Sequence, residues 1–212
     1  MNPGLTSPNP PLPPLQGGAS LSDWDFAPNL SCVLAQDYYI SPPSSLRVVA
    51  TTDGYYPILC RLPDTLHLAQ GRLITWWQAR DVRYGHRIFY FRHNSPLGGT
   101  EHNNTYFIDC EATYLYVRKR INNETTTLGQ WGFSKNNYTW YRYRITWWLQ
   151  DSLLYIRLDR WINEEWVQLG DDIIDYDPYI PPEGYYRCGI GYERITYSYY
   201  TWFDDTEIWA PA

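Results

Sequence analysis

The chain has 212 residues, a formal net charge of −6 and an aromatic content of 18%. This length is enough for one domain with a sizeable core, and the acidic balance argues against nucleic acid as a partner. No stretch reaches the ~20 apolar residues needed to cross a membrane, so we expect no membrane insertion. The aromatic load favours strands over helices.

The four cysteines lie far apart and have no C-x-x-C or C-x-H spacing. This pattern favours buried free thiols on strands and argues against a zinc site. One or two disulfides remain the alternative, and four cysteines allow three pairings. The residues concerned are Cys32, Cys60, Cys110 and Cys188.

Residues 1–18 are rich in Pro, Gly and Asn, and they show no periodicity. This composition predicts an extended, polyproline-like arm, either a disordered tail or an arm that lies along a neighbouring subunit. We expect the folded domain to occupy residues 19–212. The arm has neither a basic start nor an apolar h-region, so we do not expect a signal peptide, and synthesis in the cytoplasm follows.

From residue 21 onward, alternating apolar and polar positions predict about twelve strands and no helix of ten or more residues, enough for two packed sheets. We interpret residues 121–127 as a loop tip and residues 170–184 as an acidic, proline-broken loop. Residues 161–169 fit a strand or a helical turn. The predicted strands span residues 31–35, 45–51, 55–62, 72–79, 86–93, 105–110, 113–120, 128–133, 140–149, 153–159, 185–193 and 199–209.

The segment Trp140–Asp159 reads as a β-hairpin with a polar turn at residues 150–152. One set of alternating positions is apolar, which is typical of a half-buried antiparallel strand. We expect this set to be core: Tyr143, Ile145, Trp147, Ile156 and Leu158. The other set carries arginines and must face outward, because burying unpaired charge is costly.

Several short motifs then occur in a characteristic order: W-Y-R-Y-R-I-T-W at 140–147, L-L-Y-I-R-L-D at 153–159, C-G-I-G-Y at 188–192 and W-F-D-D-T-E-I at 202–208. Together with S-S-L-R-V at 44–48, they resemble the concanavalin A-like lectin/glucanase superfamily, especially its LamG-like members. The resemblance implies an all-β, two-sheet antiparallel jelly-roll sandwich with one concave face. Members of the superfamily include carbohydrate-binding modules, glucanases, lyases, adhesion domains and viral attachment proteins.

The glucanases of this superfamily carry an E-x-D-x-x-E strand, which this chain lacks. Asp171, Asp175 and Asp177 come nearest, but a proline-rich loop surrounds them. We therefore expect a non-enzymatic protein, with a lyase that uses a Tyr or His base beside an Arg left open. The histidines His67, His86, His93 and His102 are interpreted as ordinary surface or packing residues, since His86 and His93 flank one strand at opposite ends.

For the pair Asp204-Asp205, the resemblance implies a structural calcium ion, to which Asp23 or Asp25 would add oxygens. The alternative is a carboxylate pair that caps the edge of the sheet and meets an arginine. No other cofactor is expected.

The best binding candidate is the cationic and aromatic face of the predicted hairpin and of the strand at 72–79. Sugar rings stack on aromatic faces, but Tyr, Trp and Arg are also enriched where proteins meet, so both partners stay open. The candidate residues are Trp76, Gln78, Arg142, Arg144, Trp148, Tyr155 and Arg157.

From these features we predict a structural or recognition protein, a virion or phage-type surface component. It would assemble with other protein subunits, as a homo-oligomer or a larger assembly, and would bind glycans. The predicted location is the virion or the extracellular surface. The alternatives are a secreted carbohydrate-binding module and a polysaccharide lyase or glycosidase.

Overall fold

The computed structural model describes residues 21–40, 45–61, 69–83, 85–94, 103–180, 186–194 and 199–209. Within these ranges every regular element is a β-strand, apart from one 3-10 turn, η1 (Leu21–Asp23). None of the described segments forms a helix long and apolar enough to cross a membrane. The prediction of an all-β chain is confirmed, whereas the predicted arm at 1–18 lies outside the described residues.

Fifteen strands are present in the described ranges, three more than the sequence predicts. They are β1 (Trp24–Phe26), β2 (Leu30–Ala35), β3 (Ser45–Ala50), β4 (Gly54–Cys60), β5 (Gly71–Ala79), β6 (His86–His93), β7 (Thr105–Cys110), β8 (Tyr114–Ile121), β9 (Glu124–Gly132), β10 (Tyr141–Gln150), β11 (Leu153–Ile162), β12 (Glu165–Gln168), β13 (Ile173–Asp175), β14 (Arg187–Arg194) and β15 (Thr201–Trp209).

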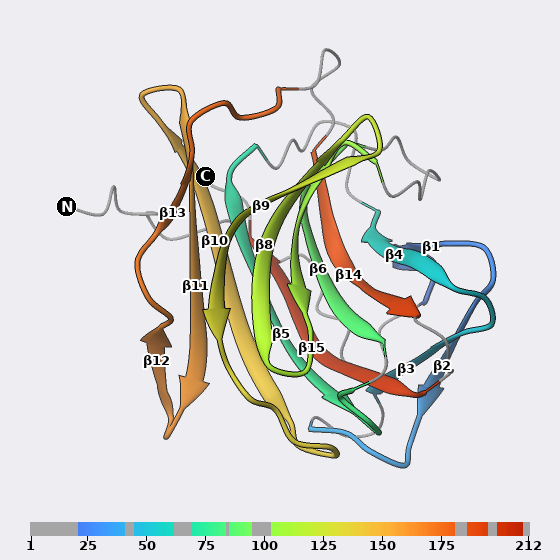
Figure 1. The fold of residues 1–212 in the computed structure, drawn as a ribbon. Coiled ribbons are helices and arrows are strands. Elements are labelled where there is room, and N and C mark those ends of the chain that lie inside the picture. Colours follow the sequence, from blue (N-terminus) through green and yellow to red (C-terminus); the bar gives the residue numbers. More distant parts are fainter. Residues whose placement is uncertain are drawn as a thin grey trace.

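The strands form two antiparallel sheets that lie face to face (Figure 1). The seven-stranded sheet has the order β1-β4-β14-β6-β7-β8-β9, and the eight-stranded sheet has the order β12-β11-β10-β5-β15-β3-β2, with β13 paired to β11. The late strands β14 and β15 each enter the middle of a sheet, between strands from the first half of the chain. The two-sheet antiparallel sandwich is therefore the predicted architecture.

The core fills the space between the sheets and is rich in aromatic rings. Phe91 of β6 meets Trp147 of β10, with ring centroids 5.3 Å apart, and Phe89 meets Tyr143 edge-on at 6.0 Å. Such pairs add to the free energy gained from burial alone. Many of the aromatic side chains in the sequence thus pack between the two sheets and hold them together.

The hairpin β10–β11 has the predicted register. Trp147 lies opposite Ile156, and Trp148 lies opposite Tyr155. All five residues expected in the core have no exposed surface. The turn is the two-residue pair Asp151-Ser152, with φ values of 53° and 63°, which is the backbone of a tight hairpin that matches the twist of its strands.

The same positive φ values recur at Asn122-Asn123 and at Asn163-Glu164, and they correct two predictions. The loop tip expected at 121–127 is wrong, since β9 already begins at Glu124. The segment 161–169 is neither one strand nor a helical turn, but the end of β11, a turn and β12. Asn tolerates the left-handed backbone, so each two-residue turn lets the strand continue close to the tip. The loop expected at 170–184 likewise contains β13.

Gly189 and Gly191 of β14 point to the outer side of the seven-stranded sheet, where neighbouring groups approach closely. A Cβ atom at Gly189 would collide with the backbone carbonyl of Ile58, and one at Gly191 would collide with the ring of Tyr90. Only glycine leaves this space to its neighbours.

All four cysteines are free in the structure, and Cys60, Cys110 and Cys188 are buried. This agrees with the prediction of buried thiols on strands. Burial raises the pKa of the Cys110 thiol to about 11, so the thiol stays protonated at neutral pH.

Candidate functional site

The predicted binding residues lie on the outer side of the eight-stranded sheet, across β5, β10 and β11. Strand pairing sets Arg142 opposite Trp76 and Tyr155 opposite Trp148. We call this surface the aromatic–arginine face, made up of Trp76, Arg142, Arg144, Trp148, Tyr155 and Arg157. All six side chains are half-buried, so each is packed in place yet still reachable from solvent.

Arg142 is the centre of one half of this face. Its guanidinium lies 5.5 Å from the ring centre of Trp76, 5.6 Å from that of Trp161 and 5.4 Å from that of Trp166. It also donates to Glu207 Oε1 at 3.2 Å. Rings and guanidinium hold one another in place, because a cation is attracted to the face of a tryptophan.

Trp161 and Trp166 were not among the predicted site residues. They lie opposite each other in the hairpin β11–β12, and their rings meet edge-on at 5.0 Å. They are not evident from the sequence as long as residues 161–169 are interpreted as a single strand or a helical turn. The signal that was available is Asn163-Glu164, flanked by a tryptophan two residues away on each side.

The other half of the face lies nearer the Asp151-Ser152 turn. Trp148 stacks on Tyr155 with centroids 5.4 Å apart and planes at 13°. Arg157 lies 5.6 Å from the ring centre of Trp148 and bonds Asp172 through two nitrogens, each at 2.7 Å. Six residues of strand separate Trp148 from Arg142, so the two halves lie about 20 Å apart.

Each arginine of the aromatic–arginine face has a carboxylate partner. Arg144 donates to Asp159 at 2.9 Å, as Arg142 does to Glu207 and Arg157 to Asp172. The hydrogen bond to Asp172 raises the pKa of Arg157 above its usual value. The arginines therefore act as fixed hydrogen-bonding frames without adding net positive charge.

Gln78 does not belong to this face as predicted. It has the expected outward register on β5, but only 2% of it is exposed. Its Nε2 donates to the backbone carbonyl of Tyr138 at 3.0 Å, and the amide of Tyr138 donates to Ala79 at 2.8 Å. The loop before β10 therefore covers the end of β5 and removes Gln78 from the surface.

Asp204 and Asp25, two of the residues proposed for calcium, are engaged with other partners. Asp204 lies at an irregularity of β15, where its two carboxylate oxygens accept the backbone amides of Ile40 at 2.7 Å and Asp205 at 2.8 Å. Asp25 sits in the other sheet and binds Arg61 and Arg187. Within the described part of the chain, Asp204 and Asp205 belong to no group of three acidic, His or Cys side chains able to hold a metal.

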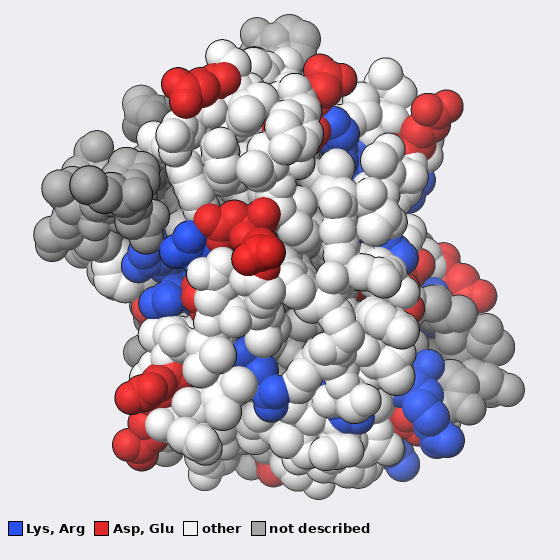
Figure 2. Space-filling view, turned by 60° about the vertical axis from the view of Figure 1, so that its left-hand side comes forward, with Lys and Arg blue, Asp and Glu red and all other residues white. Residues whose placement is uncertain are grey.

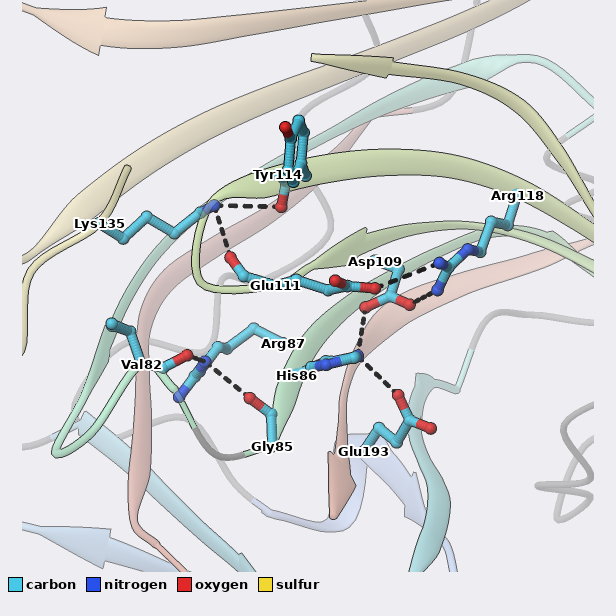
Figure 3. A network of polar contacts seen from close by, with 10 residues as sticks. All are labelled: Val82, Gly85, His86, Arg87, Asp109, Glu111, Tyr114, Arg118, Lys135 and Glu193. Atoms are coloured by element: carbon cyan, nitrogen blue, oxygen red, sulfur yellow. Dashed lines mark hydrogen bonds and ion pairs between the residues drawn. The ribbon is translucent and has the colours of Figure 1, made fainter. Parts of the chain in front are cut away.

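A second polar site, unforeseen from the sequence, lies on the outer side of the seven-stranded sheet (Figure 3). His86 Nδ1 lies 2.9 Å from Asp109 Oδ1 and 2.7 Å from Glu193 Oε2. Arg118 binds Asp109 and also Glu111, the latter at 3.2 Å. We call these residues the carboxylate–histidine cluster: His86, Asp109, Glu111, Arg118 and Glu193.

The cluster unites β6, β7, β8 and β14, which the sequence separates widely. Its members share no motif, and His86 was expected to be an ordinary surface or packing residue. Tyr55 of β4 adjoins the cluster: burial, followed by the negative charge of Glu193 and a hydrogen bond with it, raises the pKa of Tyr55 to about 12. Its hydroxyl therefore stays protonated at neutral pH.

Comparison with known proteins rests on structure alone, since no family model and no curated protein matches the sequence. A seed lectin of Lotus tetragonolobus superposes with a TM-score of 0.59 at 9% identity, over 94% of this chain and 97% of the lectin. The fold is a concanavalin A-like jelly roll. This jelly roll also matches the carbohydrate binding module CBM66 from Bacillus subtilis, with a TM-score of 0.51 at 11% identity over 86% of this chain and 96% of the module. The globular domain of T. cruzi calreticulin gives 0.53 at 13% identity, over 91% and 85%.

Proposed function

We propose that this chain is a non-enzymatic carbohydrate-binding jelly-roll protein that holds its glycan on the aromatic–arginine face. One observation carries the proposal: this face presents two groups of half-buried aromatic rings, each fixed by a paired arginine. Rings held in place lose little conformational entropy when a ligand stacks on them. The names of two similar structures, a lectin and a carbohydrate binding module, point the same way.

The charges on the face favour a neutral glycan over a sulfated or uronic one. Arg142, Arg144 and Arg157 each bind a carboxylate already, so an anionic sugar would have to compete with Glu207, Asp159 or Asp172. On the side seen in Figure 2, acidic and basic groups of the coloured residues lie in small mixed clusters rather than in one broad field. Hydroxyl groups can share arginine and carboxylate partners alike without such competition.

The direct experiment is calorimetric titration with neutral oligosaccharides, chosen by a glycan array. Trp148→Ala and Trp166→Ala remove one ring from each half of the face, and we expect each to weaken binding about tenfold, which corresponds to ~1.4 kcal/mol. Tyr114→Ala is the matched control, since Tyr114 is an exposed aromatic (41%) on the other sheet. Equal losses in all three variants, or binding only to anionic glycans, would overturn the proposal.

A role in assembly has its own supporting observation. Strand β2 is the edge of the eight-stranded sheet, and it exposes Val33 (40%) and Leu34 (42%), followed by Tyr39 (42%). An apolar edge strand is a template for pairing with another chain. We therefore propose that the chain works as a subunit of a larger surface assembly of the virion or phage type, and that it recognises glycans from there.

Light scattering on the full chain tests this second role. We expect a dimer or larger species, which Val33→Lys should convert to monomers, because a charge on an edge strand blocks pairing. A wild-type chain that stays monomeric at high concentration would refute assembly and leave the glycan proposal untouched.

A further inference from the structure

Three members of the carboxylate–histidine cluster, His86, Asp109 and Glu193, lie on three adjacent strands. In the seven-stranded sheet β6 lies between β14 and β7, and His86 lies opposite Glu193 of β14. Asp109, on β7, points to the same side of the sheet as His86. The sheet thus sets an imidazole between two carboxylates, and these positions follow from strand pairing rather than from a loop.

Three atoms converge in this cluster without forming hydrogen bonds. Asp109 has no exposed surface, and its Oδ1, together with Glu193 Oε2 and His86 Nδ1, is buried without a hydrogen-bond partner. The nitrogen is 2.9 Å and 2.7 Å from the two oxygens, a distance at which a well-directed N–H would bond. Neither oxygen therefore lies in the direction in which a ring proton would point. This is the arrangement expected if the lone pair of His86 Nδ1 faces a cation instead.

The charges of the cluster also call for a cation. Asp109 and Glu111 share one guanidinium, that of Arg118, and Glu193 meets the imidazole of His86, so with a neutral imidazole the carboxylates of the cluster outnumber its cations. Uncompensated charge is costly at buried positions. Arg118 occupies one oxygen of Asp109 and one of Glu111, which leaves the other oxygen of each for a ligand.

We propose that this cluster binds a divalent first-row transition-metal ion of the Zn²⁺ class. The ligands are His86, Asp109 and Glu111, whose donor atoms all lie within 4.8 Å of one another. Glu193, with Oε2 at 2.7 Å from His86 Nδ1, is a further carboxylate beside the imidazole. One imidazole with carboxylates suits Zn²⁺ better than Ca²⁺, which takes oxygens only.

The site keeps one side toward solvent. The side chains of His86 and Glu111 are 16% and 28% exposed, so three protein ligands would leave a coordination position for water or for an oxygen of a bound molecule. This site lies on the opposite sheet from the aromatic–arginine face and does not depend on the proposed glycan.

The test is calorimetric titration of the chelator-treated full chain with Zn²⁺, and with Mn²⁺ and Ca²⁺ in parallel. We expect one Zn²⁺ per chain with a Kd below about 10 μM, a rise in melting temperature through linkage to the folded state, and much weaker binding of Ca²⁺. His86→Ala and Glu111→Gln are expected to weaken Zn²⁺ binding at least 100-fold. Asp37→Asn, which changes an ion-paired carboxylate beside the eight-stranded sheet, is expected to change nothing.

A measurement on the unmutated chain guards against variants that fail to fold. Co²⁺ in place of Zn²⁺ is expected to give visible absorption bands of a low-coordinate site, and Zn²⁺ is expected to shift the imidazole ¹⁵N resonances of His86. Binding that survives His86→Ala would mean an adventitious ion only and would overturn the proposal. So would an imidazolium of His86 whose resonances Zn²⁺ leaves unchanged, since a proton would then bridge the two carboxylates.

Discussion

Replacing Trp147 and Trp148 one at a time tests the register on which the aromatic–arginine face depends. Trp147 has no exposed surface and packs on Phe91 across the sandwich. A buried tryptophan removes about 150–250 Å² from water, which at about 25 cal/mol per Å² corresponds to roughly 4–6 kcal/mol as an upper estimate. We therefore expect Trp147→Ala to cost about 3–5 kcal/mol of unfolding free energy.

Trp148 is half-buried and stacks on Tyr155. Losing that stack is expected to cost about 0.5–1.5 kcal/mol, while binding suffers more than stability. Urea or guanidinium unfolding, followed by far-UV circular dichroism, measures both variants, and an unchanged slope keeps the comparison valid. Equal destabilisation by the two substitutions, or a larger effect of Trp148→Ala, would mean that the register is off by one residue. The assignment of the aromatic–arginine face to the surface would then be refuted.

Deleting residues 1–18 is expected to leave the melting temperature nearly unchanged and to weaken assembly; a large fall in a monomeric sample would contradict this. Asp25→Asn is expected to cost about 3–5 kcal/mol, because it leaves Arg187, itself buried, without its carboxylate. Asp25→Leu combined with Arg187→Met is expected to cost less in the same denaturation assay, and the opposite ranking would refute the argument. Burial raises the pKa of Cys32 from 9.0 to about 12, so this thiol should react slowly with Ellman's reagent at pH 8. Because the folded state keeps this thiol protonated, the free energy of unfolding is unaffected by Cys32 below pH 9 and falls as the pH rises toward 12. Cys32→Ser should therefore reduce the fall in melting temperature over this pH range.

The sequence alone determined which residues of the central hairpin share a face. Successive side chains of a strand point to opposite sides, so the run from Tyr141 to Leu158 already separates core from surface. The polar turn was also predicted, at residues 150–152, and the structure narrows it to Asp151-Ser152 because Gln150 still pairs with Leu153. For the same reason the arginines and aromatic residues of the predicted face lie together, with Gln78 as the exception.

Local patterns failed where a distant segment changed the environment of a strand. Gln78 has the expected register, but the loop that carries Tyr138 covers it. In β6, Arg87 points into the sandwich, where three backbone carbonyls accept its guanidinium hydrogen bonds. On the outer side of the same strand, Ile88 and Tyr90 are buried. A strand with both faces buried has no contrast between its two sets of positions, so its alternation does not tell which set faces the core.

The carboxylate–histidine cluster was decided only by the tertiary structure. His86, Asp109 and Glu193 meet because β14 enters the seven-stranded sheet beside β6. A period of two residues fixes the side of a strand on which a residue lies, whereas the order of strands depends on pairings across a hundred residues or more of chain. Local sequence therefore gave the faces of each strand, and the long-range packing of the two sheets decided which of these faces meet.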